Sequence, residues 1–269
     1  MFYHERANVV ATLVVLGLIL MAFLQFPTWT YDLKVLGSPL TLSLTQTVLI
    51  ASLLVGITCA GTDIIVRSHP AAQRNEAQHS FVTWTLPALT VLTATVLIPQ
   101  APTQLYQLLG YIVTGLILIL IISAEYHTVD RAERRYLTAR FILNGWAYLL
   151  ASLLFVLIYS AKARSLLSAT AVTGVSALLA LEFLRGAGRG FARTALYAAI
   201  AGLCTGEIIW AMNYWRISGV TGGLILLLGF YVTTGLASQQ LQGRLTRQVL
   251  AEYGAVALIG LAILLRFGP

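Results

Sequence analysis

The fold is decided by Leu105-Tyr-Gln-Leu-Leu-Gly-Tyr-Ile-Val-Thr-Gly-Leu-Ile-Leu-Ile-Leu-Ile-Ile-Ser-Ala124, a stretch without a single acidic or basic side chain. About 20 apolar residues in an α-helix are long enough to cross the hydrocarbon core of a bilayer. Backbone groups in hydrocarbon must be hydrogen-bonded within the segment, which favours a helix over a strand. The sequence therefore predicts a transmembrane helix over 105–124.

Similar apolar stretches lie on both sides of this segment, and together they predict an all-α, polytopic transmembrane bundle of about nine spans. The last stretch is the shortest, and without it eight spans remain. We interpret residues 1–269 as a single integral membrane domain. The other predicted spans are 8–26, 43–65, 81–99, 138–160, 165–184, 193–214, 218–238 and 249–266.

The composition supports the membrane interpretation. Hydrophobic residues make up 58% of the chain and charged residues only 10%, whereas a soluble domain carries about 25% charged residues. The net charge of +7 comes from arginines gathered in loops, so we attribute it to membrane topology and expect no nucleic-acid partner. The apolar stretch after Arg6 is too long for a cleavable signal peptide, and we expect it to remain as the first span.

The basic residues predict the orientation. With the N-terminus in the cytoplasm, the inside segments hold 12 of the 17 Lys and Arg residues and the outside segments hold 5, as the positive-inside rule requires. Nine spans then place the C-terminus outside. The five outside residues are Lys34, Lys162, Arg164, Arg216 and Arg266.

Residues 30–45 form an insertion between the first two predicted spans, on the predicted exterior side. Apolar residues alternate with polar ones on both sides of the turn-forming Gly37-Ser38-Pro39, which is typical of a β-hairpin. An ordered loop is the alternative. Because an isolated hairpin is marginally stable in water, we expect it to lie on helix ends, the membrane surface or a partner. The alternating apolar residues are Leu33, Val35, Leu40, Leu42 and Leu44.

Four short motifs resemble an uncharacterised family of multi-pass bacterial membrane proteins, a domain of unknown function. They are Leu36-Gly-Ser-Pro-Leu-Thr-Leu42, Ala60-Gly-Thr-Asp63, Arg67-Ser-His-Pro70 and Trp84-Thr-Leu-Pro-Ala88. The resemblance covers about the first half of the chain. It implies a bacterial membrane protein, and it supplies no activity, catalytic residue or partner. For a multi-pass helical chain of this kind we expect the cell inner membrane.

One ionisable residue, Glu207, lies near the middle of the predicted span 193–214. A carboxylate inside a bilayer is costly, so this group is expected to be protonated or paired. A transport path using Glu207 with Asn144 or Asn213 is one interpretation, and a single interhelical hydrogen bond is the other. The same helix carries Ala198, Gly202 and Gly206 at four-residue spacing, which predicts close packing against a neighbouring helix.

Acidic residues end three spans on the predicted cytoplasmic side: Asp63, Glu125 and Glu182. A metal or phosphate site formed by Asp63, Glu125, His127 and some of the nearby arginines is one hypothesis, but no ligand pair has the spacing of a known metal motif. Ion pairs are the alternative, because Arg67 follows Asp63 by four residues and Arg185 follows Glu182 by three. No histidine lies within a span, which disfavours haem, and we expect neither a metal nor a cofactor.

The loop before the fifth span is rich in arginine, with Arg131, Arg134, Arg135 and Arg140. Arginines at a membrane surface bind anionic lipid headgroups, and they also set topology.

The sequence leaves three functions open. The first is an accessory or scaffold subunit of a membrane assembly, with membrane lipids and other membrane-protein subunits as partners. The second is a small-solute or proton-coupled transporter using Glu207, and the third is an enzyme acting on a lipid headgroup at the cytoplasmic rim.

Overall fold

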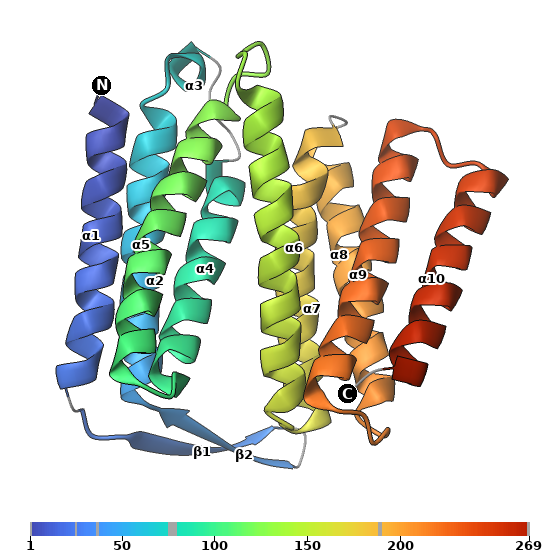
Figure 1. Cartoon of the computed structure of the whole chain (residues 1–269), viewed down its shortest axis with the longest axis horizontal. Helices are drawn as coiled ribbons and strands as arrows, with labels where there is room; N and C mark the ends of the chain where they lie inside the picture. Colours follow the sequence, from blue (N-terminus) through green and yellow to red (C-terminus); the bar gives the residue numbers. More distant parts are fainter. Residues whose placement is uncertain (1, 25, 36–37, 75–79, 188–189, 268–269) are drawn as a thin grey trace. The chain divides into compact units, whose positions relative to one another are not determined.

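Nine long apolar helices dominate the computed structural model of the chain (Figure 1), and this count of nine within the described residues confirms the predicted number of spans. The structure describes residues 2–24, 26–35, 38–74, 80–187 and 190–267. The backbone divides into two compact units, Met1–Ile142 and Leu143–Pro269.

The first unit contains α1, the strands β1 and β2, and the helices α2 to α5. Their bounds are α1 Phe2–Phe23, β1 Trp29–Val35, β2 Ser38–Leu44, α2 Gln46–Arg67, α3 Pro70–Arg74, α4 Thr85–Leu97 and α5 Gln104–His127. Two 3-10 segments, η1 Ser80–Trp84 and η2 Ile98–Gln100, extend α4 at its two ends. The helix α6, Tyr136–Ser160, begins in this unit and continues into the second.

The first helix differs from the predicted 8–26, because it begins at Phe2 and ends at Phe23. Glu5 and Arg6 lie within it, since polar residues can continue a helix past the hydrocarbon. The chain then meets Pro27, and the residue before a proline is disfavoured in the helical conformation. The sequence pattern located the apolar segment, whereas the helix ends depend on local backbone chemistry.

The core of the first unit lies around α4. In its transmembrane segment 67% of residues are buried, against 28% for the segments of α1 and α5, so α4 is the central helix of this unit. Residues from α1, α2, α4 and α5 meet in one apolar cluster. Its buried members are Ala11, Val14, Leu18, Ile50, Leu54, Val91, Ala94, Ile98 and Leu118.

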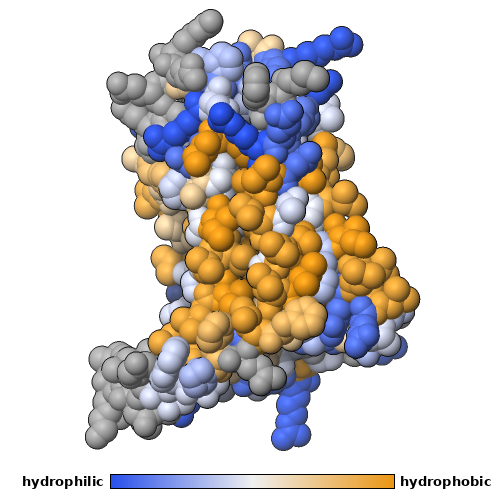
Figure 2. Space-filling view, turned by 90° about the vertical axis from the view of Figure 1, so that its left-hand side faces the viewer, coloured by the Kyte–Doolittle hydropathy of each residue, from blue (hydrophilic) through white to orange (hydrophobic). Residues whose placement is uncertain are grey.

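Figure 2 shows a broad hydrophobic band between hydrophilic ends on one face of the molecule, as expected for a membrane-spanning protein.

The predicted hairpin is present. The strands β1 and β2 pair antiparallel, with Trp29 opposite Leu44 and Leu33 opposite Leu40. The period-two alternation therefore selected the correct alternative over an ordered loop. Residues 36 and 37, which include the predicted turn residue Gly37, lie outside the described residues. Directly after the hairpin, Thr45 caps α2 by accepting a hydrogen bond from the backbone N–H of Val48.

The second unit contains the rest of α6 and the helices α7 Ser165–Leu184, α8 Phe191–Met212, α9 Gly219–Gln242 and α10 Arg247–Phe267, with a 3-10 segment, η3 Arg185–Ala187, after α7. Aromatic rings fill its interior: Phe155 and Phe230 are fully buried and contact each other edge to face, with ring centroids 5.8 Å apart. By contrast, none of the transmembrane segment of α10 is buried. This helix contacts α9, where Tyr253 lies directly over Gly235.

Candidate functional site

Polar side chains gather at one end of the first unit, where α1 begins, α2 and α5 end, and α6 begins. We call this end the N-terminal rim. The helix α5 ends at His127, and the Thr128 side chain donates a hydrogen bond of 2.8 Å to the carbonyl oxygen of Glu125. A short loop then leads to α6 at Tyr136. These helix ends bring residues from distant parts of the sequence together.

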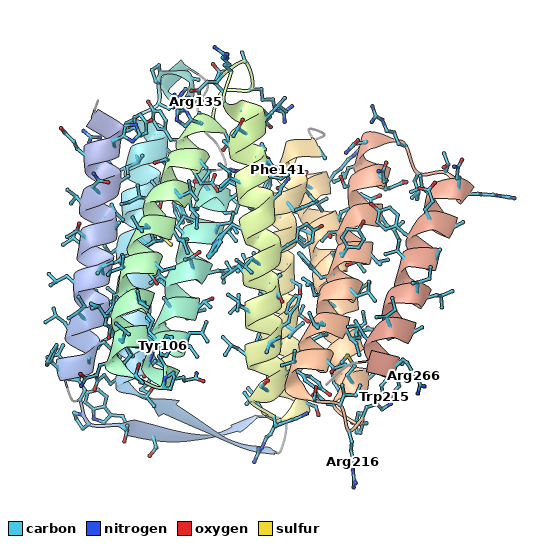
Figure 3. The ribbon with its side chains drawn as sticks, in the orientation of Figure 1. Tyr106, Arg135, Phe141, Trp215, Arg216 and Arg266 are labelled. Atoms are coloured by element: carbon cyan, nitrogen blue, oxygen red, sulfur yellow. The ribbon has the colours of Figure 1, made fainter. Side chains whose placement is uncertain are left out.

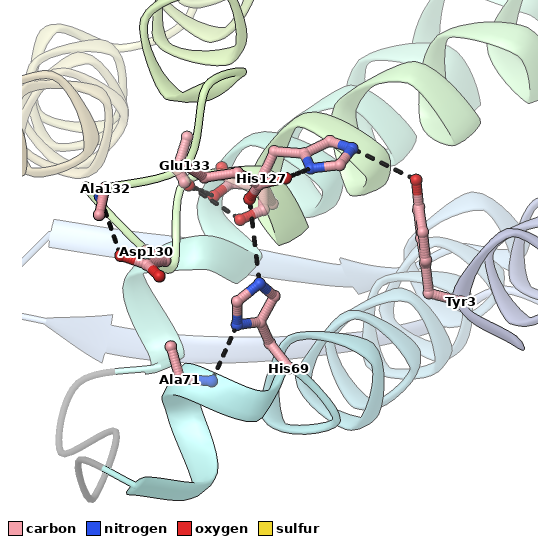
Figure 4. A network of polar contacts seen from close by, with 9 residues as sticks. Tyr3, His69, Ala71, His127, Asp130, Ala132 and Glu133 are labelled. Carbon is pink, nitrogen blue, oxygen red and sulfur yellow. Dashed lines mark hydrogen bonds and ion pairs between the residues drawn. The ribbon is translucent and has the colours of Figure 1, made fainter. Parts of the chain in front are cut away.

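The centre of this rim is Glu133, which lies between two histidines (Figure 4). One carboxylate oxygen is 2.6 Å from Nδ1 of His127, and the other is 3.9 Å from Nε2 of His69. On the far side of its ring, His127 Nε2 contacts the hydroxyl of Tyr3 at 3.2 Å. Tyr126 packs between these groups. We refer to Tyr3, His69, Tyr126, His127 and Glu133 as the Glu133 cluster.

Aromatic stacking holds the cluster together as well as hydrogen bonds. The rings of Tyr3 and Tyr126 stack with centroids 4.3 Å apart and planes tilted by only 6°. The ring of His69 meets Tyr126 edge-on, at 4.6 Å. Such pairs contribute about 0.5–1.5 kcal/mol each beyond the burial of their area. The cluster therefore ties the first turn of α1 to the ends of α2 and α5.

The hydrogen bonds assign the proton positions in the two histidines. His69 Nδ1 accepts from the backbone N–H of Ala71 at 3.1 Å, so its proton lies on Nε2, facing Glu133. In His127 every group is satisfied when Nδ1–H donates to Glu133 and the Tyr3 hydroxyl donates to Nε2. Both nitrogens of His127 are thus engaged within the protein. This arrangement holds a loop in place and leaves His127 without a free nitrogen for a ligand.

Sequence reasoning placed His127 at this rim but missed Glu133 and Tyr3. Glu133 lies in a loop, where helical spacing gives no guide to which side chain turns inward. A local signal was available: Asp130 begins a turn in which its side chain accepts from the backbone N–H of Ala132 at 2.9 Å. That turn directs Glu133 back toward α5. Tyr3 lies 124 residues from its partner, and no sequence pattern links the two.

The acidic residues at the helix ends form the ion pairs that their spacing predicts. Asp63 binds Arg67 Nε at 2.7 Å, and its other oxygen accepts from Trp84 Nε1 at 3.3 Å. In the second unit, Glu182 binds Arg185 Nε at 2.9 Å. The two pairs differ in burial, because the Glu182 side chain is 1% exposed and that of Asp63 is 21% exposed. A helix-end acid is therefore held by an arginine in each unit.

The hypothetical metal site of Asp63, Glu125 and His127 has a different arrangement in the structure. Asp63 binds Arg67 and Trp84, whereas His127 binds Glu133 and Tyr3. Glu125 is fully buried in α5. Within the described ranges, no group of three His, Cys, Asp or Glu side chains has the geometry to hold a metal ion.

Glu207 lies on the exposed face of α8, five residues before the helix ends at Met212. At about 1.5 Å per residue it is roughly 8 Å from that end, so it is nearer the end than the middle of the helix. Asn213 caps the same helix, and its amide donates to the Ser168 hydroxyl at 2.9 Å. Asn144 is half-buried on α6. Asn213 is thus engaged with α7, while the Glu207 carboxylate faces outward.

The stripe of Ala198, Gly202 and Gly206 packs against α7. A methyl group added at Gly202 would lie 2.7 Å from the carbonyl oxygen of Thr173 and 2.8 Å from the Ala177 methyl group. One added at Gly206 would overlap the Thr173 hydroxyl. Ala198 is 2% exposed. The small residues allow the two helix backbones to approach more closely than any larger side chain would permit.

The arginines of the loop fall into two classes. Arg131, Arg134 and Arg135 are exposed at the N-terminal rim, where Figure 3 shows Arg135. Arg140 differs, because it lies one turn inside α6 and is only 9% exposed. A guanidinium that is buried among protein groups is not accessible to a lipid headgroup. Three of the four predicted headgroup ligands are therefore accessible, and Arg140 is not.

A comparison with protein families identifies the chain. The family described as "Protein of unknown function (DUF5656)" matches residues 26–267. No curated protein and no solved structure matches the chain. The match extends from the hairpin to the last helix, well beyond the first half in which the motif resemblance was noted. This multi-pass membrane protein therefore belongs to the DUF5656 family of proteins of unknown function.

Proposed function

We propose that the protein is an accessory or scaffold subunit, which binds another membrane protein through the outer face of α8. The observation that carries this proposal is Glu207, an exposed carboxylate within a membrane-spanning helix. A carboxylate facing lipid costs a few kcal/mol, and the usual solution is a partner in a neighbouring helix. The partner is a transmembrane helix that presents a basic or amide side chain to Glu207.

The residues around Glu207 suit a partner helix. Exposed side chains follow one another along α8 at alternating spacings of four and three residues, the repeat with which one helix packs along another. A single polar residue within such an apolar seam selects its partner and fixes the register. The exposed residues at this spacing are Leu196, Ile200, Leu203, Glu207 and Trp210.

A groove beside this seam adds to the surface. It lies between α8 and α9, has a volume of about 260 Å³, and is lined by Ile200 and Cys204 from α8 and by Thr233 and Leu236 from α9. Side chains of a neighbouring helix pack into grooves of this kind. A second copy of the chain is a poorer occupant, because two-fold pairing along the seam would bring Glu207 near Glu207.

The outward position of Glu207 also weighs against the transport alternative. Transporters place their ionisable groups toward the interior of the bundle or a water-filled cavity. Glu207 lies on the outer face of α8, and Asn213 is bound to Ser168 on α7. At the N-terminal rim, the engagement of Asp63 and His127 in separate contacts weighs against the headgroup enzyme.

Cys204 offers a native position for testing the proposal, since it is exposed and lies three residues before Glu207 on the same face. The Cys59→Ser protein would carry a photoactivatable label on Cys204 alone and be irradiated in membranes of its own host. We expect one protein adduct of defined mass, lost in Glu207→Leu and retained in Glu207→Gln, which keeps the hydrogen bond. A matched control labels Leu166→Cys, at an exposed position of α7, in a chain lacking both native cysteines.

Two outcomes contradict the proposal. An adduct that survives Glu207→Leu unchanged shows that the carboxylate does not select the partner. An adduct of twice the chain's mass shows that the face joins two copies. The supporting result requires in addition that the captured protein has a transmembrane helix with a basic or amide side chain.

A further inference from the structure

A groove opens at the N-terminal rim between the start of α1, the end of α5 and the start of α6. Its volume is about 390 Å³. All of its lining residues belong to the first unit, whereas α8 belongs to the second. The residues that matter here are His4, His127, Arg135 and Thr138 at the rim, and Leu120 and Ile142 below them.

The groove changes from polar to apolar along the helix axes. The helix α5 ends at His127, and Leu120 lies seven residues deeper. Arg135 directly precedes the antiparallel α6, and Ile142 lies seven residues further along, within that helix. Seven residues are about two turns, or roughly 10 Å, on each helix. Polar groups thus line the mouth, and apolar walls continue below it toward the hydrocarbon.

The mouth carries positive charge that the loop leaves available. The segment 130–135 contains three arginines and two acids. Neither acid is paired with an arginine in the contacts described above, since Glu133 faces the two histidines and Asp130 accepts from the backbone N–H of Ala132, and the segment keeps a net charge of +1. The three arginines are exposed, and Arg135 is the one that lines the groove. His4 lines the opposite side, with its ring over Tyr3.

We propose that this groove binds one anionic phospholipid of the surrounding leaflet. The guanidinium of Arg135 binds the phosphate, and His4 and the Thr138 hydroxyl donate to the remaining headgroup oxygens. One acyl chain lies against Leu120 and Ile142. His127 lines the groove but does not bind the headgroup, because Tyr3 and Glu133 occupy both of its ring nitrogens. The cluster instead positions the loop that carries Arg135.

The shape of the groove favours a lipid over a soluble anion. Phosphate alone needs only the charged mouth, and it would leave the apolar walls two turns deep without an occupant. A phospholipid matches both parts, because its charge and its acyl chains are separated along the membrane normal in the same sense. Anionic headgroups gain from each nearby arginine, while a zwitterionic headgroup gains far less.

The test is native mass spectrometry of the full-length protein in mild detergent. Phosphatidylglycerol and phosphatidylcholine with identical acyl chains are added at equal concentration, and the ratio of retained lipids is measured. Arg135→Gln removes the charge at the mouth. Thr138→Trp fills the groove without changing charge. Arg216→Gln is the matched control, because it removes an exposed arginine that lies outside the groove.

We expect the unmodified protein to retain phosphatidylglycerol about fivefold over phosphatidylcholine, the factor that one arginine contact supplies. Arg135→Gln should abolish that preference, Thr138→Trp should reduce the retention of both lipids, and Arg216→Gln should change neither. The proposal is overturned if the unmodified protein shows no preference, or if Arg135→Gln and Arg216→Gln behave alike. Release of phosphatidylglycerol by millimolar inorganic phosphate would identify a phosphate site instead. Melting temperatures matching that of the unmodified protein exclude misfolded variants.

Discussion

Glu133 and His127 are six residues apart in the sequence and are joined by a contact of 2.6 Å between a carboxylate oxygen and Nδ1. The contact closes the loop between α5 and α6 on itself. Because Tyr3 reaches the same pair from α1 and His69 from the turn between α2 and α3, the loop contacts α1, α5 and the turn that follows α2. The connection between α5 and α6 is thereby held against the neighbouring helix ends.

This contact predicts the effect of Glu133→Gln on stability. An amide keeps one hydrogen bond but loses the charge that both histidines face. We expect a loss of about 1–2 kcal/mol, or a melting temperature lower by about 2–6 °C in detergent. Glu5→Gln, at an exposed acid of α1, is the control and should have little effect. Equal melting temperatures for the two variants would show that the cluster contributes nothing measurable.

The close packing of Gly202 against α7 predicts that the same glycine-to-alanine substitution changes stability differently at two positions. Gly202→Ala places a methyl group 2.7 Å from the Thr173 carbonyl oxygen, so the helices must separate, and overpacking costs about 1–3 kcal/mol. Gly174→Ala on α7 has nothing within 4 Å of the added carbon, and we expect it to be neutral or slightly stabilising. Thermal unfolding of both purified variants tests this. Similar losses at both positions would contradict the expectation, because helix propensity favours alanine at both sites and only Gly202 lies close to the neighbouring backbone.

The two helix-end ion pairs differ in burial, so we expect removal of each arginine to lower the stability by a different amount. Arg185→Gln removes a partner of the buried Glu182, and loss of one member of a buried pair costs several kcal/mol. Arg67 is 60% exposed, so Arg67→Gln should cost below about 1 kcal/mol. Chemical denaturation in mixed micelles would compare them. A larger loss for Arg67→Gln would contradict this ranking.

The positive-inside pattern predicts where each end of α10 lies. We expect a reporter fused after Gly243, between α9 and α10, to be cytoplasmic, and one fused after Pro269 to be exterior. Green fluorescent protein fluoresces only in the first compartment, and alkaline phosphatase is active only in the second. A cytoplasmic reporter at both positions would mean that α10 does not cross the membrane.

The sequence predicted the long helices because uncharged, mainly apolar stretches of about 20 residues have few alternatives. The hairpin was predictable for a similar reason, since period-two alternation across Leu33 and Leu40 fits paired strands. The helix that packs against Gly202 could not be predicted. A stripe of small residues shows which face of α8 is in close contact, but it does not show which helix makes that contact. The Glu133 cluster could not be predicted either, since its contacts join a loop to three helix ends. Glu207 was recognised as unusual, but its outward direction depends on which side of α8 faces α7.

The close packing of the small-residue stripe of α8 against α7 has a consequence for biosynthesis. With the Thr173 carbonyl oxygen pressed against Gly202, no acyl chain can enter between the two helices once they have met. Only the short segment 185–190 separates them in the chain, so the second helix emerges from the ribosome shortly after the first. We therefore expect the pair to leave the translocon as one hairpin, assembled before α10 is inserted.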